Sequence, residues 1–199
     1  VRARPVDLLA APRVRAQQVF TDYRREQPGW MSHDGEGFWQ AAAACCQRLW
    51  EQQREWQGRI AGVAVTTQRG SIVPMDASGR CLAPVLIWLD QRRASQLPRI
   101  APWWRAAFAL VGVGDTIASF QREAEVNWWA QHEPDMHAKA HKFMLVSGLL
   151  NQRLTGRFVD SIGSQVAYLP FDYKRHAWAP ASDWKWQALP ITPAMLPEL

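Results

Sequence analysis

The feature that most constrains the fold is the segment Ile60–Val65, which carries no polar side chain. A short segment that is apolar on both faces is typical of an inner strand covered by helices on both sides of a sheet. After Thr66 and Thr67 come the polar residues Gln68, Arg69 and Ser71. In open α/β sheets, the groups that follow a buried strand usually bind ligands. We therefore predict an inner parallel strand at 60–65 and a ligand-binding tip at 68–71.

An amphipathic helix is predicted just before this strand. Apolar residues recur at helical spacing from Phe38 through Ala41 and Cys45 to Leu49. Asp34 stands where a helix begins, and its side chain suits the N-cap position. The helix is expected to end before Gly58.

Strands and helices are expected to alternate along the rest of the chain. Strands are predicted at 71–75 and 85–89, with a turn that ends in a left-handed glycine at 76–79. Helices are predicted at 90–97, 123–131 and 138–153. This alternation predicts an α/β domain.

The length of the chain allows one globular domain, and its net charge permits a nucleic-acid partner but does not argue for one. The chain has 199 residues, of which 48% are hydrophobic and 21% charged, and a formal net charge of +5. These values are ordinary for one domain with a real core. The basic residues are scattered and form no long run, so we do not expect nucleic-acid binding.

Cysteine usage and hydropathy favour a reduced, cytoplasmic protein without a membrane segment. Three cysteines, of which Cys45 and Cys46 are adjacent, make a poor disulfide framework and have no metal-binding spacing. No segment approaches the ~18 consecutive apolar residues of a membrane span. The twelve tryptophans are interpreted mainly as packing residues, with a sugar-stacking surface as the alternative.

Several familiar sites are absent from the sequence. There is no glycine-rich phosphate loop of either common type and no serine nucleophile motif. His137 and His141 have a spacing that could bind a metal on a helix, but no third ligand accompanies them. We therefore predict no metal site and no serine-nucleophile chemistry.

The tip at 68–71 has the chemistry that a polyhydroxylated ligand needs. Gln68 offers two donors and an acceptor, and Arg69 offers a fork of donors. An ordinary exposed turn explains the same residues equally well.

A family resemblance favours the binding interpretation. The chain resembles the N-terminal domain of the FGGY carbohydrate kinases, such as glycerol and xylulose kinases. The segments that carry the resemblance are Val63–Gly70, Asp76–Gly79, Leu86–Arg92, Pro28–Trp30, Leu154–Gly156, Phe171–Asp172 and Leu196–Glu198. The resemblance implies a ribonuclease H-like (actin-like ATPase) domain, with a mixed sheet flanked by helices.

The resemblance also implies where the acceptor would bind. It places Gln68 and Arg69 in the acceptor pocket, followed by Gly70. Trp88 would pack against the carbons of the substrate, and Asp90 would hold the loop or contact the substrate.

The chain departs from the family pattern at three positions. Phe120 stands where glycerol kinases present a tyrosine to the acceptor. Gly70 stands where relatives place Glu or His, and Glu125 replaces a common lysine. These departures argue against glycerol as the substrate.

The resemblance implies that residues 1–199 are an acceptor-binding domain that is incomplete at both ends, with the nucleotide-binding domain outside. The full-length protein would phosphorylate a sugar or polyol with ATP and Mg²⁺, bound mostly outside this chain. The resemblance places the catalytic aspartate outside this chain as well, so no catalytic residue is expected here and this chain alone would be inactive. A small-molecule partner is implied, and a homodimer is allowed. The alternative is a non-catalytic carbohydrate-binding or regulatory module.

Overall fold

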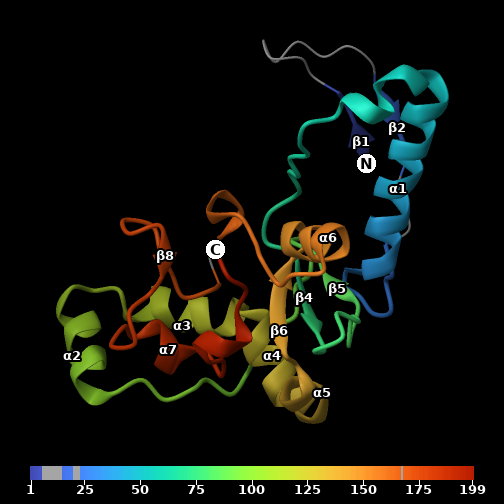
Figure 1. The fold of residues 1–199 in the computed structure, drawn as a ribbon. Helices are drawn as coiled ribbons and strands as arrows, with labels where there is room; N and C mark the ends of the chain where they lie inside the picture. The colour runs from blue at the N-terminus through green and yellow to red at the C-terminus, as the bar shows by residue number, and fades with distance from the viewer. Residues whose placement is uncertain (6–14, 20–22, 167) are drawn as a thin grey trace.

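A four-stranded sheet lies at the centre of the fold (Figure 1). In spatial order its strands are β3 (Ser32–His33), β5 (Val85–Leu86), β4 (Ile72–Met75) and β6 (Lys142–Leu145). The computed structural model describes residues 1–5, 15–19, 23–166 and 168–199. All three pairings of this sheet are antiparallel. The mixture of helices and strands confirms the α/β class, but the parallel pairing expected of a mixed sheet does not occur in the described part of this sheet.

Helices and short hairpins surround the sheet, and Figure 1 shows α1 and α6 on one side and α2, α3, α4 and α7 on the other. The α-helices are α1 (Gly35–Gln52), α2 (Pro102–Leu110), α3 (Gly114–Glu123), α4 (Glu125–His132), α5 (Pro134–Lys139), α6 (Val146–Thr155) and α7 (Lys185–Ala188). The 3₁₀ turns are η1 (Arg54–Arg59), η2 (Ile162–Ser164) and η3 (Pro193–Met195). Two small hairpins pair β1 (Arg2–Ala3) with β2 (Ala16–Gln17), and β7 (Phe171–Asp172) with β8 (Ala177–Trp178).

Successive side chains of each strand point to opposite faces of the sheet. Both faces are buried, because a hydrophobic cluster covers each of them. Toward α1 and α6 lies a cluster of Phe38, Val73, Met75, Val85, Ile87, Met144, Val146 and Leu149. Toward α4 and the C-terminal segment lies a second cluster, which includes Ile72, Leu86, Trp128, Trp129, Phe143, Leu145, Leu189 and Leu196. Strands β4, β5 and β6 therefore contain continuous apolar runs although the sheet is antiparallel.

The predicted first helix is confirmed as α1. The Asp34 side chain accepts a hydrogen bond from Glu36 N at 3.2 Å, which is the N-cap role expected for it. Phe38, Ala41, Cys45 and Leu49 form its buried stripe. The helix ends at Gln52, and Gly58 lies within the following turn η1.

The predicted turn at 76–79 is also confirmed. Asp76 Oδ1 accepts from the backbone N–H of Ser78 and of Arg80, each at 2.9 Å. Gly79 has φ +82°, a left-handed conformation that favours glycine. Arg153 of α6 donates to Gly79 O at 2.7 Å, which ties the turn to the helix.

The single helix predicted at 138–153 is wrong. Lys142–Leu145 forms β6, which pairs residue by residue with β4, and the helix α6 begins only at Val146. Hydrophobic periodicity did not distinguish strand β6 from helix α6. Phe143, Val146 and Leu149 are all buried, although only the last two lie in the helix. The helix is capped by Gly156, whose φ of +72° is the left-handed conformation typical of a glycine that ends a helix.

The buried strand predicted at 60–65 is wrong as well. Val63 is 73% exposed and Ile60 is 41% exposed, and no ladder joins this segment to another strand of the described chain. A strand needs a neighbour to satisfy its backbone groups, and an apolar sequence alone does not supply one.

The helix predicted at 90–97 does not form either. The Asp90 side chain instead binds backbone N–H groups at Met31 and Arg92, at 2.7 and 2.9 Å, which fixes a loop.

Most of the described tryptophans pack against the core, as the sequence predicts. Trp128 and Trp129 are buried, and five others lie partly buried against the same cluster: Trp30, Trp104, Trp178, Trp184 and Trp186. Trp88 and Trp103 are exposed, at 62% and 68%. Among the described helices, none has both the length and the apolar character needed to cross a membrane.

Two valines test whether β4 is buried and segment 60–65 is exposed. Val73→Ala should lower the free energy of unfolding of the 199-residue chain by about 2 kcal/mol, because Val73 is fully buried. Val63→Ala removes the same atoms from an exposed position and should change it by less than about 0.5 kcal/mol. Urea unfolding measures both. An equal loss in the two variants would show that segment 60–65 is buried after all.

Candidate functional site

Three of the predicted site residues meet around the buried hydroxyl of Ser71. Gln68 Nε2 donates to Ser71 Oγ at 2.9 Å, and the backbone N–H of Trp88 donates to the same oxygen at 3.3 Å. Gly70 has φ +66°, and a Cβ built on it would lie 3.7 Å from Trp88 Cβ. The tip after segment 60–65 therefore lies against the end of β5.

Arg69 faces a second segment that the sequence does not single out. A cavity of about 440 Å³ is lined by Val65, Thr66, Thr67 and Arg69 on one side and by Ser161, Gly163 and Ser164 on the other. Arg69 is exposed and forms no ion pair within the described part of the chain. We call this polar space the tip cavity.

The second wall of the tip cavity is held in place by its own hydrogen bonds. Asp160 Oδ1 accepts from Ser161 N at 2.7 Å, and Ser161 Oγ accepts from Gly163 N at 3.2 Å. Gln165 Nε2 donates to Ser161 O at 3.0 Å. Asp160 is 6% exposed, and this burial raises the pKa of its carboxyl group. The hydroxyls of Ser161 and Ser164 are thus presented on a fixed turn.

Asp90 holds a loop, which is the first of the two roles predicted for it. Its Oδ2 accepts from Met31 N at 2.7 Å, and both carboxylate oxygens accept from the Arg92 guanidinium at 2.8 to 3.0 Å. The two side chains are 4% and 9% exposed. These bonds occupy the carboxylate and leave it little capacity for a substrate.

The guanidinium of Arg92 lies between two indole rings. Its Cζ is 4.4 Å from the Trp30 ring centroid and 4.8 Å from that of Trp128. The two rings meet edge to face at 5.5 Å. Both contacts are attractive cation–π interactions, and they join the segment before β3 to α4.

Phe120 lies in a different group of aromatic rings. Its centroid is 5.9 Å from Tyr168 and 5.3 Å from Trp184. Phe120 has no hydroxyl, but neighbouring Tyr168 has one, and it donates a hydrogen bond to the Glu123 carboxylate. Burial and this hydrogen bond raise the pKa of Tyr168 to about 12, so the hydroxyl stays protonated. None of the recorded ring contacts joins Phe120 to Trp88 within the described residues.

Glu125, which replaces the family's lysine, lies in an acidic environment. Its pKa is raised from 4.5 to about 7, first by burial and then by the charges of Asp90 and Glu123, which outweigh Arg93. The carboxyl group therefore keeps its proton to a higher pH than an exposed glutamate does.

No group of three or more His, Cys, Asp or Glu side chains that could hold a metal ion occurs in the described part of the chain. Besides Ser71 of the predicted tip, the candidate site includes two residues that the sequence does not single out, Ser161 and Ser164. The only sequence signal for the latter two is the Ser-Ile-Gly-Ser run at 161–164, which is far from the tip along the chain.

Removing the carboxylate of Asp90 should be costly. We expect Asp90→Ala to lower the free energy of unfolding by about 3 kcal/mol, because it leaves the buried Arg92 charge unpaired. The exposed pair Arg157–Glu198 (side chains 68% and 69% exposed) is the control. Glu198→Ala should cost less than about 1 kcal/mol. Equal losses would mean that burial does not distinguish the two pairs.

Glu125 should make stability depend on pH. The folded chain retains this proton to a higher pH than the unfolded chain, so the free energy of unfolding should fall as pH rises from 4.5 to about 7. Glu125→Gln should remove this fall and stabilise the chain by up to about 3 kcal/mol at pH 8, with little effect at pH 4. Urea unfolding across this range tests it, with Glu51→Gln on the surface of α1 as control. A gain that is the same at every pH would contradict the assignment.

Comparisons with known proteins agree with this architecture. The model of the N-terminal domain of the FGGY family of carbohydrate kinases matches residues 10–199. A glycerol kinase of Aromatoleum aromaticum is 26% identical over 191 residues, covering 92% of this chain and 38% of that protein. A xylulose kinase of Escherichia coli is 25% identical over 186 residues, covering 94% of this chain and 37% of that protein. The crystal structure of a xylulose kinase from Rhodospirillum rubrum has the same fold, with a TM-score of 0.76 at 20% identity, covering 98% of this chain and 40% of that one. The chain thus spans well under half the length of these relatives, and it belongs to the FGGY family of carbohydrate kinases through their N-terminal domain.

Proposed function

We propose that this chain forms the acceptor-binding wall of an enzyme that transfers a phosphoryl group from ATP to a hydroxyl of a sugar or polyol. The observation that carries the proposal is the tip cavity. It joins Arg69 to the hydroxyls of Ser161 and Ser164, and it opens next to the segment that contacts Trp88. The family membership supplies the reaction type.

The side chains around the tip cavity suit a polyhydroxylated molecule. Arg69 presents donors, and the threonine and serine hydroxyls both donate and accept. The side-chain nitrogen of Gln68 donates to Ser71 Oγ. We therefore assign the side-chain oxygen Oε1 of Gln68 to the ligand. Trp88, which is 62% exposed, offers an apolar ring face for the carbon skeleton of the acceptor.

We propose an acceptor other than glycerol. Phe120 cannot supply the hydroxyl of the tyrosine that glycerol kinases carry at this position. Gly70 has no side chain where relatives have an acid or histidine beside the arginine. A larger sugar or polyol can use the additional hydroxyls of the Ser161–Ser164 turn instead.

The phosphoryl donor in this proposal is ATP with Mg²⁺, which would supply the transferred group and neutralise its charge. The described residues offer no set of metal ligands, so we assign those contacts to parts of the protein outside this chain. The three free cysteines, Cys45, Cys46 and Cys81, fit the reducing cytoplasm that we propose as its location. A homodimer is compatible with this role.

A second candidate is a carbohydrate-binding or regulatory module without catalysis. The exposed ring of Trp88 favours it, because an accessible indole can stack on a sugar without any reaction. Release of ADP by the full-length protein with a panel of pentoses, hexoses and polyols separates the two. Sugar binding without ADP release would support the binding module and overturn the kinase proposal.

Arg69 provides the sharper test of the site. In the full-length kinase, Arg69→Gln should reduce kcat/KM for the preferred acceptor about ten- to hundredfold, mainly through KM, because a charge-assisted hydrogen bond to the acceptor is lost. Arg54→Gln, on the exposed turn η1, is the matched control and should leave the rate unchanged. We expect the KM for ATP to change little in either variant. An unchanged acceptor KM in Arg69→Gln would show that the tip cavity is not part of the acceptor site.

A further inference from the structure

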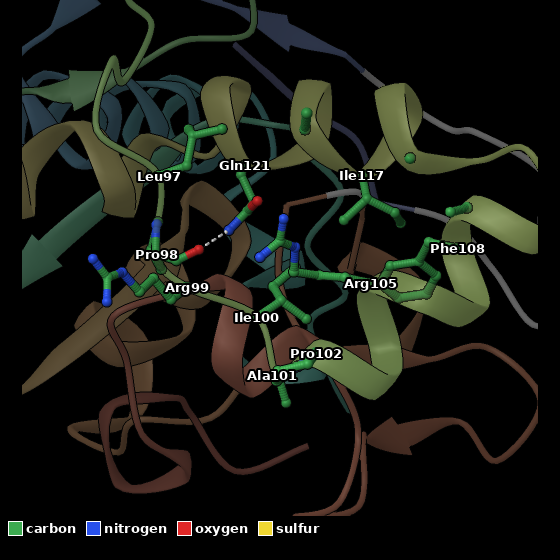
Figure 2. Close-up of a pocket in the computed structure, with 13 residues that line it drawn as sticks. Leu97, Pro98, Arg99, Ile100, Ala101, Pro102, Arg105, Phe108, Ile117 and Gln121 are labelled. Carbon is green, nitrogen blue, oxygen red and sulfur yellow. Dashed lines mark hydrogen bonds between the residues drawn. The ribbon is translucent and has the colours of Figure 1, made fainter.

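A second and larger cavity lies between α2, α3 and the loop that precedes α2 (Figure 2). Its volume is about 880 Å³, within the range of pockets that bind small molecules. It is lined by Leu97, Pro98, Arg99, Ile100, Ala101, Pro102, Arg105, Phe108, Ala109, Gly114, Ile117, Ala118 and Gln121. It shares no residue with the tip cavity, and we call it the helical cavity.

The walls of the helical cavity are largely apolar and are fixed in place. Ile100 is 8% exposed and belongs to the core, and Phe108 and Ile117 pack against the same cluster. Gln121 Nε2 donates to Pro98 O at 2.8 Å, and Gln187 Oε1 accepts from Ala101 N at 2.8 Å. These two bonds hold the loop against α3 and α7, so the cavity exists without a ligand.

Arg105 gives the helical cavity a positive charge. Figure 2 shows its side chain reaching from α2 across the cavity toward Ile100 and Gln121, whereas Arg99 points away from the centre. Within the described part of the chain, the Arg105 guanidinium forms neither an ion pair nor a side-chain hydrogen bond. A free guanidinium fork beside apolar walls is suited to a carboxylate that carries an apolar group.

We propose that the helical cavity binds a small organic anion with an apolar body, such as a medium-chain or aryl carboxylate. A sugar does not fit these walls, because Arg105 and Gln121 are the main polar side chains that face it and a polyol needs many more partners. Inorganic phosphate would leave the apolar walls unfilled. The shared requirement is one anionic group beside Arg105 and an apolar body against Ile100, Phe108 and Ile117.

Octanoate is the probe for a direct test, with binding to the full-length protein measured by isothermal titration calorimetry. Arg105→Gln should weaken octanoate binding about ten- to hundredfold, because the charge-assisted hydrogen bonds are lost. Arg99→Gln removes an equal charge from the same cavity lining and should leave the affinity unchanged. Equal losses of affinity in the two variants would show only a general electrostatic attraction between octanoate and positive charge. That result would overturn the proposal.

A second pair of variants tests the location. Ala109→Trp places a large ring in the helical cavity and should abolish binding. Ala106→Trp adds the same ring to the same helix at an exposed position outside the lining, and it should bind as the unaltered protein does. Both positions are exposed, so folding should survive, and urea unfolding checks this. Retained binding in Ala109→Trp would place the ligand elsewhere.

The ligand chemistry is tested with two further probes. Octan-1-ol has the apolar body without the charge, and acetate has the charge without the body. Both should bind at least tenfold more weakly than octanoate. Octanol binding as tight as that of octanoate would show an apolar surface without anion recognition and overturn the proposal.

Discussion

Strand β4 is the element on which the rest of the structure depends. It pairs with β5 on one edge and with β6 on the other, and its alternate side chains enter both hydrophobic clusters. Val73 and Met75 pack toward α1 and α6, and Ile72 packs toward α4. Each layer is therefore positioned by contact with the same four residues. A one-residue slip in this ladder would exchange the two faces and place every one of these side chains in the wrong cluster.

The polar groups at the ends of the strands depend on this sheet. Ser71 immediately precedes β4, and Trp88 and Asp90 follow β5. Because the two strands pair in one register, the tip at 68–71 and the β5 end meet around Ser71. The buried Asp90–Arg92 pair then fixes the direction in which the chain leaves the sheet. The candidate acceptor site thus consists of side chains on short loops whose starting points are set by a rigid ladder.

Local sequence signals predicted some elements and could not predict others. The N-cap of α1 and the turn at 76–79 depend on contacts within a few residues, and both are confirmed. Strand β6 and the exposed segment 60–65 depend on which distant strand is available for pairing, which periodicity does not contain. The same division holds at the site. Gln68, Gly70 and Trp88 meet through adjacent strands, whereas the wall that faces Arg69 comes from residues 161–164, about ninety positions later.

The hydroxyl of Ser71 has a consequence for how binding in the tip cavity could be detected. It accepts one hydrogen bond from the Gln68 side chain and one from the backbone of Trp88. A ligand that draws the Gln68 amide toward itself would change the first bond, and the shared oxygen would transmit that change to the second. Trp88 is 62% exposed, so a displacement of its backbone would change the contact of the indole with solvent, on which indole fluorescence depends. Ser71 therefore couples the side chain of Gln68, which lies next to the cavity in the chain, to the tryptophan whose ring we propose to contact the acceptor.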